Sequence, residues 1–385
     1  MNVFIELSVH DLVDFLLRKG DIDTRIFNKS SMAEGTKIHA FWQKKAGNDY
    51  LAEYPLEVFE SYAGFDFKVS GRADGIIIDD DVVTIDEIKS CIGDIDEFYL
   101  KNQEWHLGQA KVYAYMYMKE KNLNKINILL TYISQEDRHN KYHSFTYSFV
   151  EIRNYFFHLL DEYIDFYDIV KRNLKERDES IKDLDFPYIK MRKYQSDFCN
   201  YVNNSVIDKE NIMIEAPTGI GKTISVLLPH IKNYGPDLEK IFFATAKNSG
   251  KIIVKKTIES LIFKGLKARS VLLTSKENIC PLKDQICNPD KCPFAKSYYD
   301  KIKNVLTQIL ASKQYIFDKD LFTSISQEYE ICPFELQLDL SSFSDLIVCD
   351  YNYIFDPFVK LQRYLENNCK KYSLLIDEGH NLVPR

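Results

Sequence analysis

Apolar and polar residues alternate with two different periods along the first 170 residues of the chain. Helical spacing predicts helices near residues 9–19 and 32–45, a long helix at about 96–120 and a last helix before the domain ends. Alternation between turn residues predicts strands at residues 53–59, 65–72, 75–79, 82–89, 125–132 and 143–149. This mixture of elements predicts an α/β domain over residues 1–170.

The rest of the chain has a different pattern. A charge-dense stretch at residues 171–186 has few large apolar residues and is expected to connect two domains. Beyond it, short apolar runs at residues 212–214 and 372–376 predict strands, and a helix is expected at about 294–310. The 385 residues fit two domains of ordinary size plus an insert.

The net charge and the hydropathy of the chain exclude some classes of function. The formal net charge of −7 argues against binding polyanions through the whole surface. No signal peptide and no run long and apolar enough to span a membrane is present, so a cytoplasmic location without a membrane partner is expected. A local cluster of basic residues could still neutralise phosphates, and a solvated helix face is the alternative. The cluster consists of Lys247, Lys251, Lys255, Lys256, Lys264, Lys267 and Arg269.

The apolar run at residues 212–214 leads into a loop that carries the chemistry of a nucleotide site. Two glycines allow tight folding around phosphates, Lys222 can reach the β- and γ-phosphates, and the Thr223 hydroxyl can ligate Mg²⁺. The predicted ATP-binding residues of this loop are Ala216, Pro217, Thr218, Gly219, Gly221, Lys222 and Thr223. The alternative reading of this stretch is an ordinary glycine turn.

A pair of acidic residues supplies the second half of such a site. Asp377 and Glu378 end the apolar run at residues 372–376. Asp377 is expected to hold Mg²⁺, and Glu378 is expected to polarise the attacking water. The combination with the loop at Lys222 predicts an ATP hydrolase.

Together these segments resemble helicases of the XPD/DinG type. Asp377-Glu378-Gly379-His380 is similar to their motif II, with glycine in place of the usual alanine. The resemblance implies that Gln195 reads the adenine base and that residues 241–247 form a strand whose end contacts single-stranded DNA. It also implies that residues 187–385 form a RecA-like ATP-binding lobe.

Six of the eight cysteines lie between the loop and the acidic pair, and four of these are candidate metal ligands. Cys280, Cys287, Cys292 and Cys332 are separated by six, four and thirty-nine residues, and these intervals suit a cluster closed by a distant fourth ligand better than a zinc ribbon. An insert of this sort, at residues 275–335, resembles the 4Fe-4S domain of XPD-like helicases. Zinc, or reduced thiols on a loop, are the alternatives.

A third set of residues lies in the N-terminal domain. Glu87 and Lys89 are two apart on a predicted strand and share one face, and Asp74 starts the neighbouring strand. Two carboxylates can bind Mg²⁺ or Mn²⁺, while the lysine orients water and offsets charge in the transition state. Charged hairpins produce the same pattern without any function.

This arrangement resembles the PD-(D/E)XK nucleases, and two further features are similar to their RecB-like members. His39, on an early helix, resembles the additional metal ligand of that group. Gln109 and Tyr113, four apart on the long helix, resemble its Gln-x-x-x-Tyr element. His39 as a core histidine is the alternative.

The sequence therefore predicts an α/β protein, with a restriction-endonuclease-like nuclease domain joined to a RecA-like P-loop domain that carries an iron–sulfur insert. The expected function is an ATP-dependent helicase and deoxyribonuclease acting on single-stranded or forked DNA in repair or defence. The chain ends at Arg385, soon after the acidic pair, so the second motor lobe is expected in cis or in trans. The alternatives are a nuclease whose half-motor senses ATP without unwinding, and a DNA-binding module without turnover.

Overall fold

The computed structural model describes residues 3–24, 29–45, 47, 49–80, 82–246, 248–357, 359–365 and 371–382. The chain divides into two compact units. The first contains Met1–Tyr167 and Ile286–Lys303, and the second contains Asp168–Gln285 and Asn304–Arg385. A segment predicted to belong to the insert of the C-terminal domain is therefore part of the first unit.

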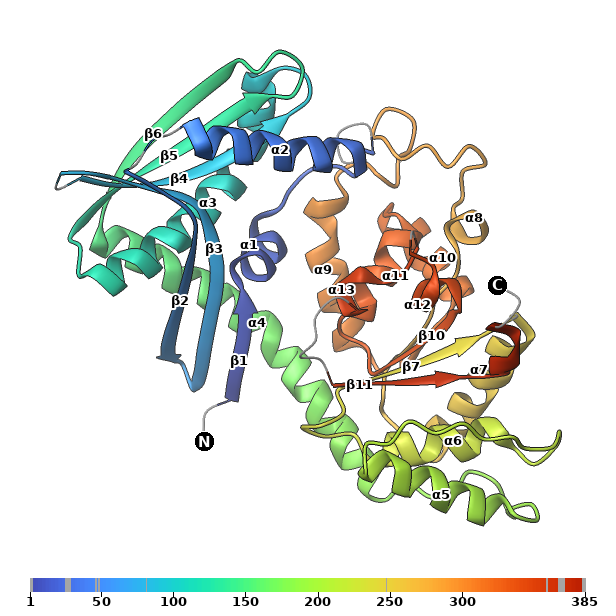
Figure 1. The fold of residues 1–385 in the computed structure, drawn as a ribbon. Helices are drawn as coiled ribbons and strands as arrows, with labels where there is room; N and C mark the ends of the chain where they lie inside the picture. Colours follow the sequence, from blue (N-terminus) through green and yellow to red (C-terminus); the bar gives the residue numbers. More distant parts are fainter. Residues whose placement is uncertain are drawn as a thin grey trace. The chain divides into compact units, whose positions relative to one another are not determined.

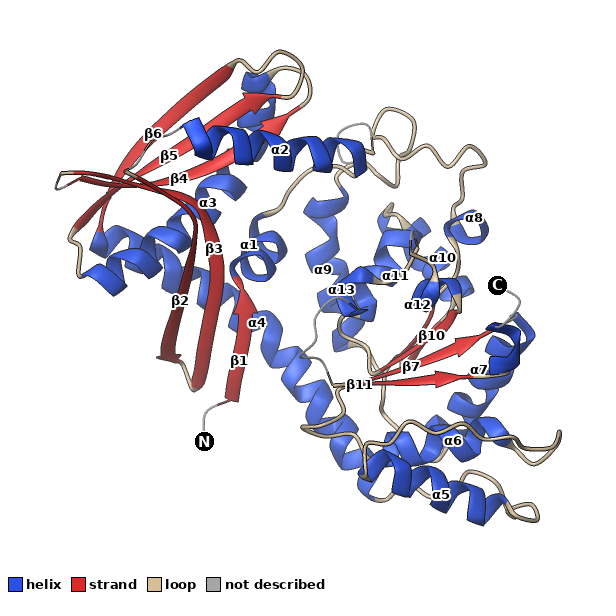
Figure 2. Ribbon diagram, in the orientation of Figure 1, coloured by secondary structure: helices blue, strands red, loops and turns tan. Residues whose placement is uncertain are grey.

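The first unit is built on a six-stranded mixed sheet (Figures 1 and 2). Its strands follow the order β1-β3-β4-β5-β6, and β2 pairs with β3. The β1–β3 and β4–β5 pairs are parallel, whereas the other pairs are antiparallel. The strands are β1 (Val3–Ser8), β2 (Tyr50–Tyr62), β3 (Phe65–Asp79), β4 (Val82–Cys91), β5 (Lys125–Ser134) and β6 (Asn140–Ser148).

The hairpin of β2 and β3 differs from the prediction in one respect. The two strands expected at residues 65–72 and 75–79 form one continuous strand, because β2 pairs with β3 from Tyr62↔Phe65 to Tyr50↔Ile77. Asp74 directly precedes Gly75, which is the first residue of β3 that pairs with β4. The short strand β1 was not predicted.

Helices cover both faces of this sheet (Figure 1). α3 (Ile95–Lys121) packs with α1 (Val9–Leu17) and α4 (Phe149–Lys182) around the main core, which includes Tyr113 and Phe156. α2 (Lys29–Lys45) covers the other face, where Ile38 and Trp42 contact Ile88 and Ile133. The start of α1 is fixed by a capping box, in which the Ser8 hydroxyl accepts from Asp11 N–H at 2.9 Å. The helices predicted from periodicity are therefore present.

The charged stretch at residues 171–186 is helical as far as Lys182, where α4 ends. Its charges favour a helix because Lys175 and Glu179 pair at four-residue spacing, 3.9 Å apart. Arg177 is buried and its Nη1 donates to Asp345 Oδ1 at 2.7 Å. Asp345 Oδ2 also accepts from Arg269 N–H at 2.7 Å. A segment expected to be a connection thus contributes a buried ion pair.

We expect Asp345→Ala to lower the free energy of unfolding by about 3 kcal/mol, because the buried Arg177 guanidinium would lose its buried partner and keep only the half-exposed Asp178. Urea denaturation followed by circular dichroism measures the loss. The control is Glu179→Ala, which removes the exposed pair with Lys175 and is expected to cost about 0.5 kcal/mol or less. Equal, small losses in both variants would contradict the assignment of a structural role to the buried pair.

The second unit contains a five-stranded parallel sheet with the order β11-β7-β10-β8-β9. α6 (Lys222–Lys232) and α7 (Asn248–Phe263) pack on one face, where Ile224, Val254 and Phe243 share a core. On the other face Phe242 contacts Tyr364, and Figure 1 shows α10 to α13 on this side. The strands are β7 (Lys240–Thr245), β8 (Ser270–Leu272), β9 (Ile316–Phe317), β10 (Leu346–Asp350) and β11 (Tyr372–Ile376).

The remaining helices of this part of the chain are short. α5 (Gln195–Ile207) precedes the predicted phosphate loop, and α9 begins four residues later than the helix expected from residue 294. The other bounds are α8 (Lys276–Ile279), α9 (Tyr298–Ala311), α10 (Lys319–Tyr329), α11 (Pro333–Ser341), α12 (Asn352–Phe355), α13 (Gln362–Leu365) and the 3₁₀ helix η1 (Gly379–Leu382).

The strand predicted at residues 212–214 is wrong. These residues lie outside the sheet, Met213 is fully exposed, and β11 is left as the edge strand. A three-residue run forms few ladder hydrogen bonds to offset the entropy lost when its backbone is ordered. None of the helices in the described ranges combines the length and apolar character required to cross a bilayer.

Candidate functional sites

The predicted phosphate loop precedes α6 and is held by the segment expected to read adenine. Gly219 and Gly221 have φ values of +84° and +87°, a region that favours glycine. A Cβ at Gly221 would lie 2.2 Å from Gln195 Nε2, so the close approach also requires glycine. Gln195 is buried, and its Nε2 donates to Gly221 O at 3.4 Å. The structure therefore joins Gln195 to the loop, a contact that the sequence analysis does not include, and the expected contact with adenine stays a prediction.

Arg192 makes a second contact that the sequence analysis did not assign. Its guanidinium donates to Gly219 O, and its backbone N–H donates to Gln195 Oε1 at 2.9 Å. The signal was present, because Arg192 lies three residues before Gln195 in the same segment. Ala216 to Thr218 form exposed or half-exposed backbone ahead of the turn, and Thr223 lies half-buried in the first turn of α6.

Lys222 and the acidic pair meet at one edge of the parallel sheet. Lys222 Nζ lies 3.3 Å from both Glu378 Oε1 and Ala216 O. Asp377 follows β11, where its N–H donates to Ala244 O at 3.0 Å. Burial and the neighbouring Glu378 raise the pKa of Asp377, and Lys222 opposes that shift. Residues far apart in the sequence thus form one charged group that can accept a metal–phosphate complex.

Tyr351 fixes the backbone that presents these two carboxylates. It is buried, and its hydroxyl contacts the carbonyl oxygens of Asp377 and, at 3.0 Å, Glu378. Glu378 has a φ of +55°, which is uncommon for a residue with a side chain. No spacing rule predicted this contact, because Tyr351 and Asp377 belong to different loops.

The basic cluster is largely neutralised by its surroundings. Lys251 Nζ binds Asp350 at 2.7 Å, Lys255 Nζ binds Asp318 at 2.6 Å, and Arg269 is buried against the carbonyl of Leu310. Lys267 lies 3.6 Å from Glu176, and Lys247 lies outside the described residues. These four residues therefore have acceptors within the protein, and their phosphate-binding role stays a prediction beside the alternative of a solvated helix face.

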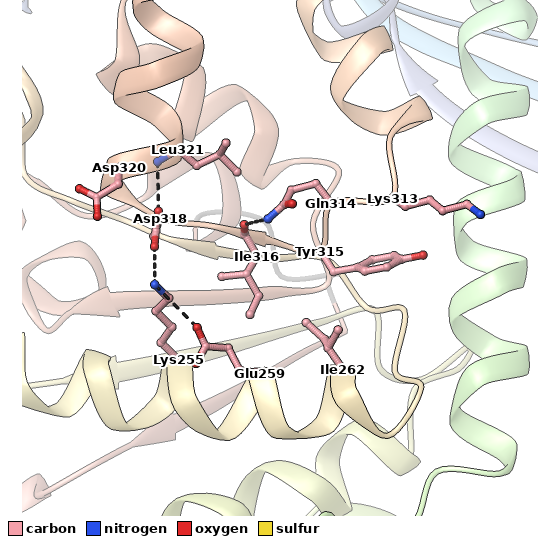
Figure 3. A pocket seen from close by; sticks show the side chains of 10 residues that line it. All are labelled: Lys255, Glu259, Ile262, Lys313, Gln314, Tyr315, Ile316, Asp318, Asp320 and Leu321. Atoms are coloured by element: carbon pink, nitrogen blue, oxygen red, sulfur yellow. Dashed lines mark hydrogen bonds and ion pairs between the residues drawn. The ribbon is translucent and has the colours of Figure 1, made fainter.

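A pocket of about 500 Å³ in the second unit uses some of the same residues (Figure 3). Lys255 spans it to bind Asp318 and Glu259, and Gln314 Nε2 donates to Ile316 O at 2.6 Å. Several of its polar groups thus bind one another, and none of the predicted ATP-binding, metal-binding or cleavage residues lines it. The lining consists of Lys255, Glu259, Ile262, Lys313, Gln314, Tyr315, Ile316, Asp318, Asp320 and Leu321.

The four predicted cluster cysteines are divided between the two units. Cys287 and Cys292 belong to the first, with Cys292 buried, whereas Cys280 ends α8 and Cys332 caps α11 in the second. Across the ranges that the structure describes, no three His, Cys, Asp or Glu side chains come together in a group that could hold a metal ion.

The predicted cleavage residues of the first unit lie together on β4 and α3. Glu87 is fully buried, and its Oε1 accepts from Lys89 Nζ at 2.6 Å. Lys89 also donates to Gln109 Oε1 at 3.2 Å. The second carboxylate oxygen of Glu87 is buried without a hydrogen-bond partner. An unpaired buried carboxylate oxygen is costly, and a cation would satisfy it.

Asp74, His39 and Tyr113 complete this group. Asp74 Oδ2 accepts from Ile88 N–H at 2.8 Å, and Asp74 Oδ1 lies 3.7 Å from His39 Nδ1. Tyr113 is buried, and its pKa is raised by burial and by the charges of Glu87 and Asp74. All six predicted residues of this site therefore belong to one neighbourhood.

The two carboxyl groups have opposite electrostatic environments. Burial raises the pKa of Glu87 to about 8, although Lys89 opposes the shift. Burial also acts to raise the pKa of Asp74, but the hydrogen bond with His39 and the charge of Lys89 outweigh it, and the net shift is downward. Pairs of carboxyl groups with divergent pKa values are typical of acid–base and metal sites.

The sequence analysis assigned no role to Asp86, which faces away from Glu87 on β4. It is buried and accepts from Thr131 Oγ1 at 2.6 Å and from Tyr50 OH at 2.9 Å. Burial raises its pKa to about 6. Its polar partners come from β2 and β5, and no local pattern in the sequence indicates them.

We expect any metal-dependent activity at this site to rise with pH until about pH 8. Glu87 must lose its proton before it can ligate a cation, and burial raises its pKa to about 8. Initial rates measured between pH 6 and pH 9 at a Mn²⁺ concentration well below saturation test this, because saturating metal would displace the proton from Glu87. Asp86→Asn is the matched control, because it removes the lower ionisation and should leave the rise near pH 8 in place. A flat profile would exclude Glu87 as the limiting group.

Comparisons with known proteins match parts of the chain. Residues 254–384 match the family model described as DEAD_2. The chain is 26% identical over 220 residues to a regulator of telomere elongation helicase 1 homolog of Caenorhabditis elegans, with 46% of this chain and 22% of the relative covered. It is 24% identical over 234 residues to the general transcription and DNA repair factor IIH helicase subunit XPD/RAD3 of Saccharomyces cerevisiae, with 51% and 29% covered.

Among solved structures, an XPD helicase aligns with a TM-score of 0.34 at 18% identity, over 51% of this chain and 34% of that chain. Residues 254–384 thus match the DEAD_2 family model, and the chain is distantly similar to the XPD and telomere-elongation helicases. The chain spans 22% and 29% of the length of the two curated relatives.

Proposed function

We propose that the protein is part of an ATP-dependent DNA helicase of the XPD type that also cleaves DNA with a divalent metal ion. The helicase-related region at residues 254–384 supports the first activity. The observation that carries the ATP site is the contact of Lys222 with Glu378, which lie 3.3 Å apart although 156 positions separate them. Two segments with complementary roles in NTP hydrolysis meet at this point.

In the proposed ATP site, Lys222 binds the β- and γ-phosphates while Thr223 and Asp377 hold Mg²⁺. Glu378 orients the attacking water, and the pair of Gln195 and Arg192 fixes the loop beneath the adenine. Tyr351 keeps Asp377 and Glu378 in register with β7 through their carbonyl oxygens. DNA, chiefly single-stranded or forked, is the proposed partner.

In the proposed nuclease site, Asp74 and Glu87 hold a divalent cation with His39 as an additional ligand. The unpaired, buried Glu87 oxygen fits this role. A bound cation would supply a hydroxide nucleophile at neutral pH. Lys89 offsets negative charge on the scissile phosphate, and Gln109 keeps the Lys89 ammonium in place.

A 4Fe-4S cluster on Cys280, Cys287, Cys292 and Cys332 is part of the proposal because four thiolates are the donors such a cluster requires. Cys287 and Cys292 belong to the first unit and Cys280 and Cys332 to the second, and no step of the mechanism depends on the cluster. Iron and acid-labile sulfide measured on anaerobically purified protein test it. Stoichiometric zinc without sulfide would replace the cluster by a zinc site.

Two measurements on the purified chain separate the activities. DNA-stimulated ATP hydrolysis, with a forked duplex as the activator, supports the motor, and Mn²⁺-dependent cleavage of labelled single-stranded DNA supports the nuclease. If the chain binds DNA tightly but shows neither activity, the protein is a DNA-binding module without turnover.

A second candidate is a nuclease that senses ATP without unwinding. The position of residues 212–214 outside the sheet favours it, because the phosphate loop then lacks the strand that would anchor it to β11. Cleavage that depends on ATP binding, in a protein that does not separate strands, would support this candidate over the helicase.

A further inference from the structure

The segment Ile286–Lys303 is an integral part of the first unit, although residues of the second unit flank it in the sequence. Main-chain hydrogen bonds join it to the stretch that follows α1. Ile22 N–H donates to Ala295 O at 2.9 Å, Thr24 N–H to Cys287 O at 2.9 Å, and Tyr299 N–H to Gly20 O at 3.0 Å. Ser297 N–H donates to Asp21 Oδ1 at 2.7 Å.

Burial accompanies these bonds. Ala295 and Tyr298 are almost fully buried, and Asp23 on the opposing stretch is buried as well. Lys303 Nζ binds Glu162 on α4 at 3.0 Å. A segment with backbone pairing, a buried aromatic ring and an ion pair is folded together with this unit.

One side chain connects the segment to the helix that carries Gln109. The Arg18 guanidinium lies 3.8 Å from the centre of the Tyr299 ring and 5.2 Å from that of the Trp105 ring. A cation over an aromatic face at these distances is attractive. Trp105 is further tied to α1, because its Nε1 donates to Asp14 Oδ1 at 2.7 Å.

Trp105 lies one helical turn before Gln109 on α3, so the two side chains share a face of the helix. Between them, α1 and α3 approach closely, because a Cβ at Gly108 would lie 2.2 Å from Leu17 Cδ1. Any shift of Arg18 or α1 must therefore displace α3. Gln109 in turn accepts from Lys89, and Lys89 binds Glu87.

We propose that residues 286–303 position the candidate cleavage site, with Arg18 held between Tyr299 and Trp105 as the coupling side chain. The segment fixes α1 and α3, and α3 holds Gln109 against Lys89. Because the chain enters and leaves the segment from the second unit, a change in the second unit has a covalent route to the Lys89 ammonium. The inference rests on the proposed nuclease function.

A double-mutant cycle on the full chain tests the coupling. Arg18→Gln and Tyr299→Ala are each expected to lower kcat of Mn²⁺-dependent cleavage by about fivefold to tenfold, with KM for DNA unchanged. The double variant should be no slower than either single variant, because both remove the same contact. Hydrogen exchange of peptides covering residues 105–109 should accelerate to the same extent in all three.

Two control variants separate positioning from folding. Tyr299→Phe retains the ring under Arg18 and should cleave like the parent protein. Lys303→Ala removes a contact of the same segment with α4 and should also leave kcat unchanged. Thermal unfolding verifies that each variant is folded. Parental cleavage by Tyr299→Phe, together with slower cleavage by Tyr299→Ala, would show that the aromatic ring holds Arg18 in place.

Parental kcat in Arg18→Gln, or losses that multiply in the double variant, would overturn the coupling and leave the nuclease proposal intact. A parent chain that binds Mn²⁺ but does not cleave DNA would overturn the nuclease proposal and this inference with it. The activity of the parent protein therefore distinguishes the two failures.

Discussion

Lys89→Ala is expected to reduce metal-dependent DNA cleavage by about a thousandfold while leaving ATP binding unchanged. The Lys89 ammonium donates to Glu87 and Gln109, and its positive charge opposes the negative charges of both Glu87 and Asp74. Without it, Glu87 would remain buried next to Asp74 with no opposing charge, and the scissile phosphate would lose its stabilising partner. Single-turnover cleavage of labelled single-stranded DNA measures the loss.

The control for this variant is a lysine on the neighbouring helix. Lys37 on α2 is exposed and lies 3.4 Å from Glu34, so Lys37→Ala removes the same charge from the surface and should cleave at the parental rate. Fluorescent-nucleotide titration of both variants tests whether the ATP site is intact. Persistent Mn²⁺-dependent cutting by Lys89→Ala would end the nuclease assignment for this group of residues.

Lys222→Ala is expected to weaken ATP binding by about a hundredfold, because the phosphates lose charge-assisted hydrogen bonds worth about 2–3 kcal/mol. The variant also leaves Glu378 without its partner at 3.3 Å, so negative charge accumulates where the γ-phosphate must bind. The dissociation constant for ATP, with and without Mg²⁺, measures the effect.

A second variant separates binding from hydrolysis at the same site. Glu378→Gln keeps the size of the side chain and should bind ATP at least as tightly as the parent, since it removes a negative charge near the phosphates. Its DNA-stimulated hydrolysis should fall strongly. Equal ATP affinity in Lys222→Ala and the parent would show that the loop at residues 216–223 is not the nucleotide site.

The elements of the first unit follow from its sequence because each has a clear period. α3 and β4 were predicted to within a few residues, and their alternation places Glu87 and Lys89 on one face toward Gln109. The charged stretch at Lys175 was interpreted as a connection because its apolar residues are few, but α4 is stabilised there by the pair of Arg177 with Asp345, which is remote in the sequence. Long-range pairing of this kind leaves no local pattern.

The site residues were predictable where a spacing rule applied. Lys222 and Gln195 were singled out from the loop and from its upstream segment, and in the structure Gln195 donates to Gly221 of that loop. By contrast, the sequence does not indicate that Asp350 binds Lys251 or that Asp318 binds Lys255, because neither acid is near its lysine in the chain. Tyr50 and Thr131 donate to Asp86 from other strands of the sheet. These contacts could be predicted only if the strand order were known.

The backbone at Glu378 has an implication for engineering. A φ of +55° costs a side-chain-bearing residue about 1 kcal/mol relative to glycine, and the Tyr351 hydroxyl contributes to holding that conformation through the Glu378 carbonyl. Substitution by glycine would relieve the strain and remove the carboxylate in one step. Selection of this protein for heat resistance alone would therefore favour losing the residue on which its proposed ATP hydrolysis depends.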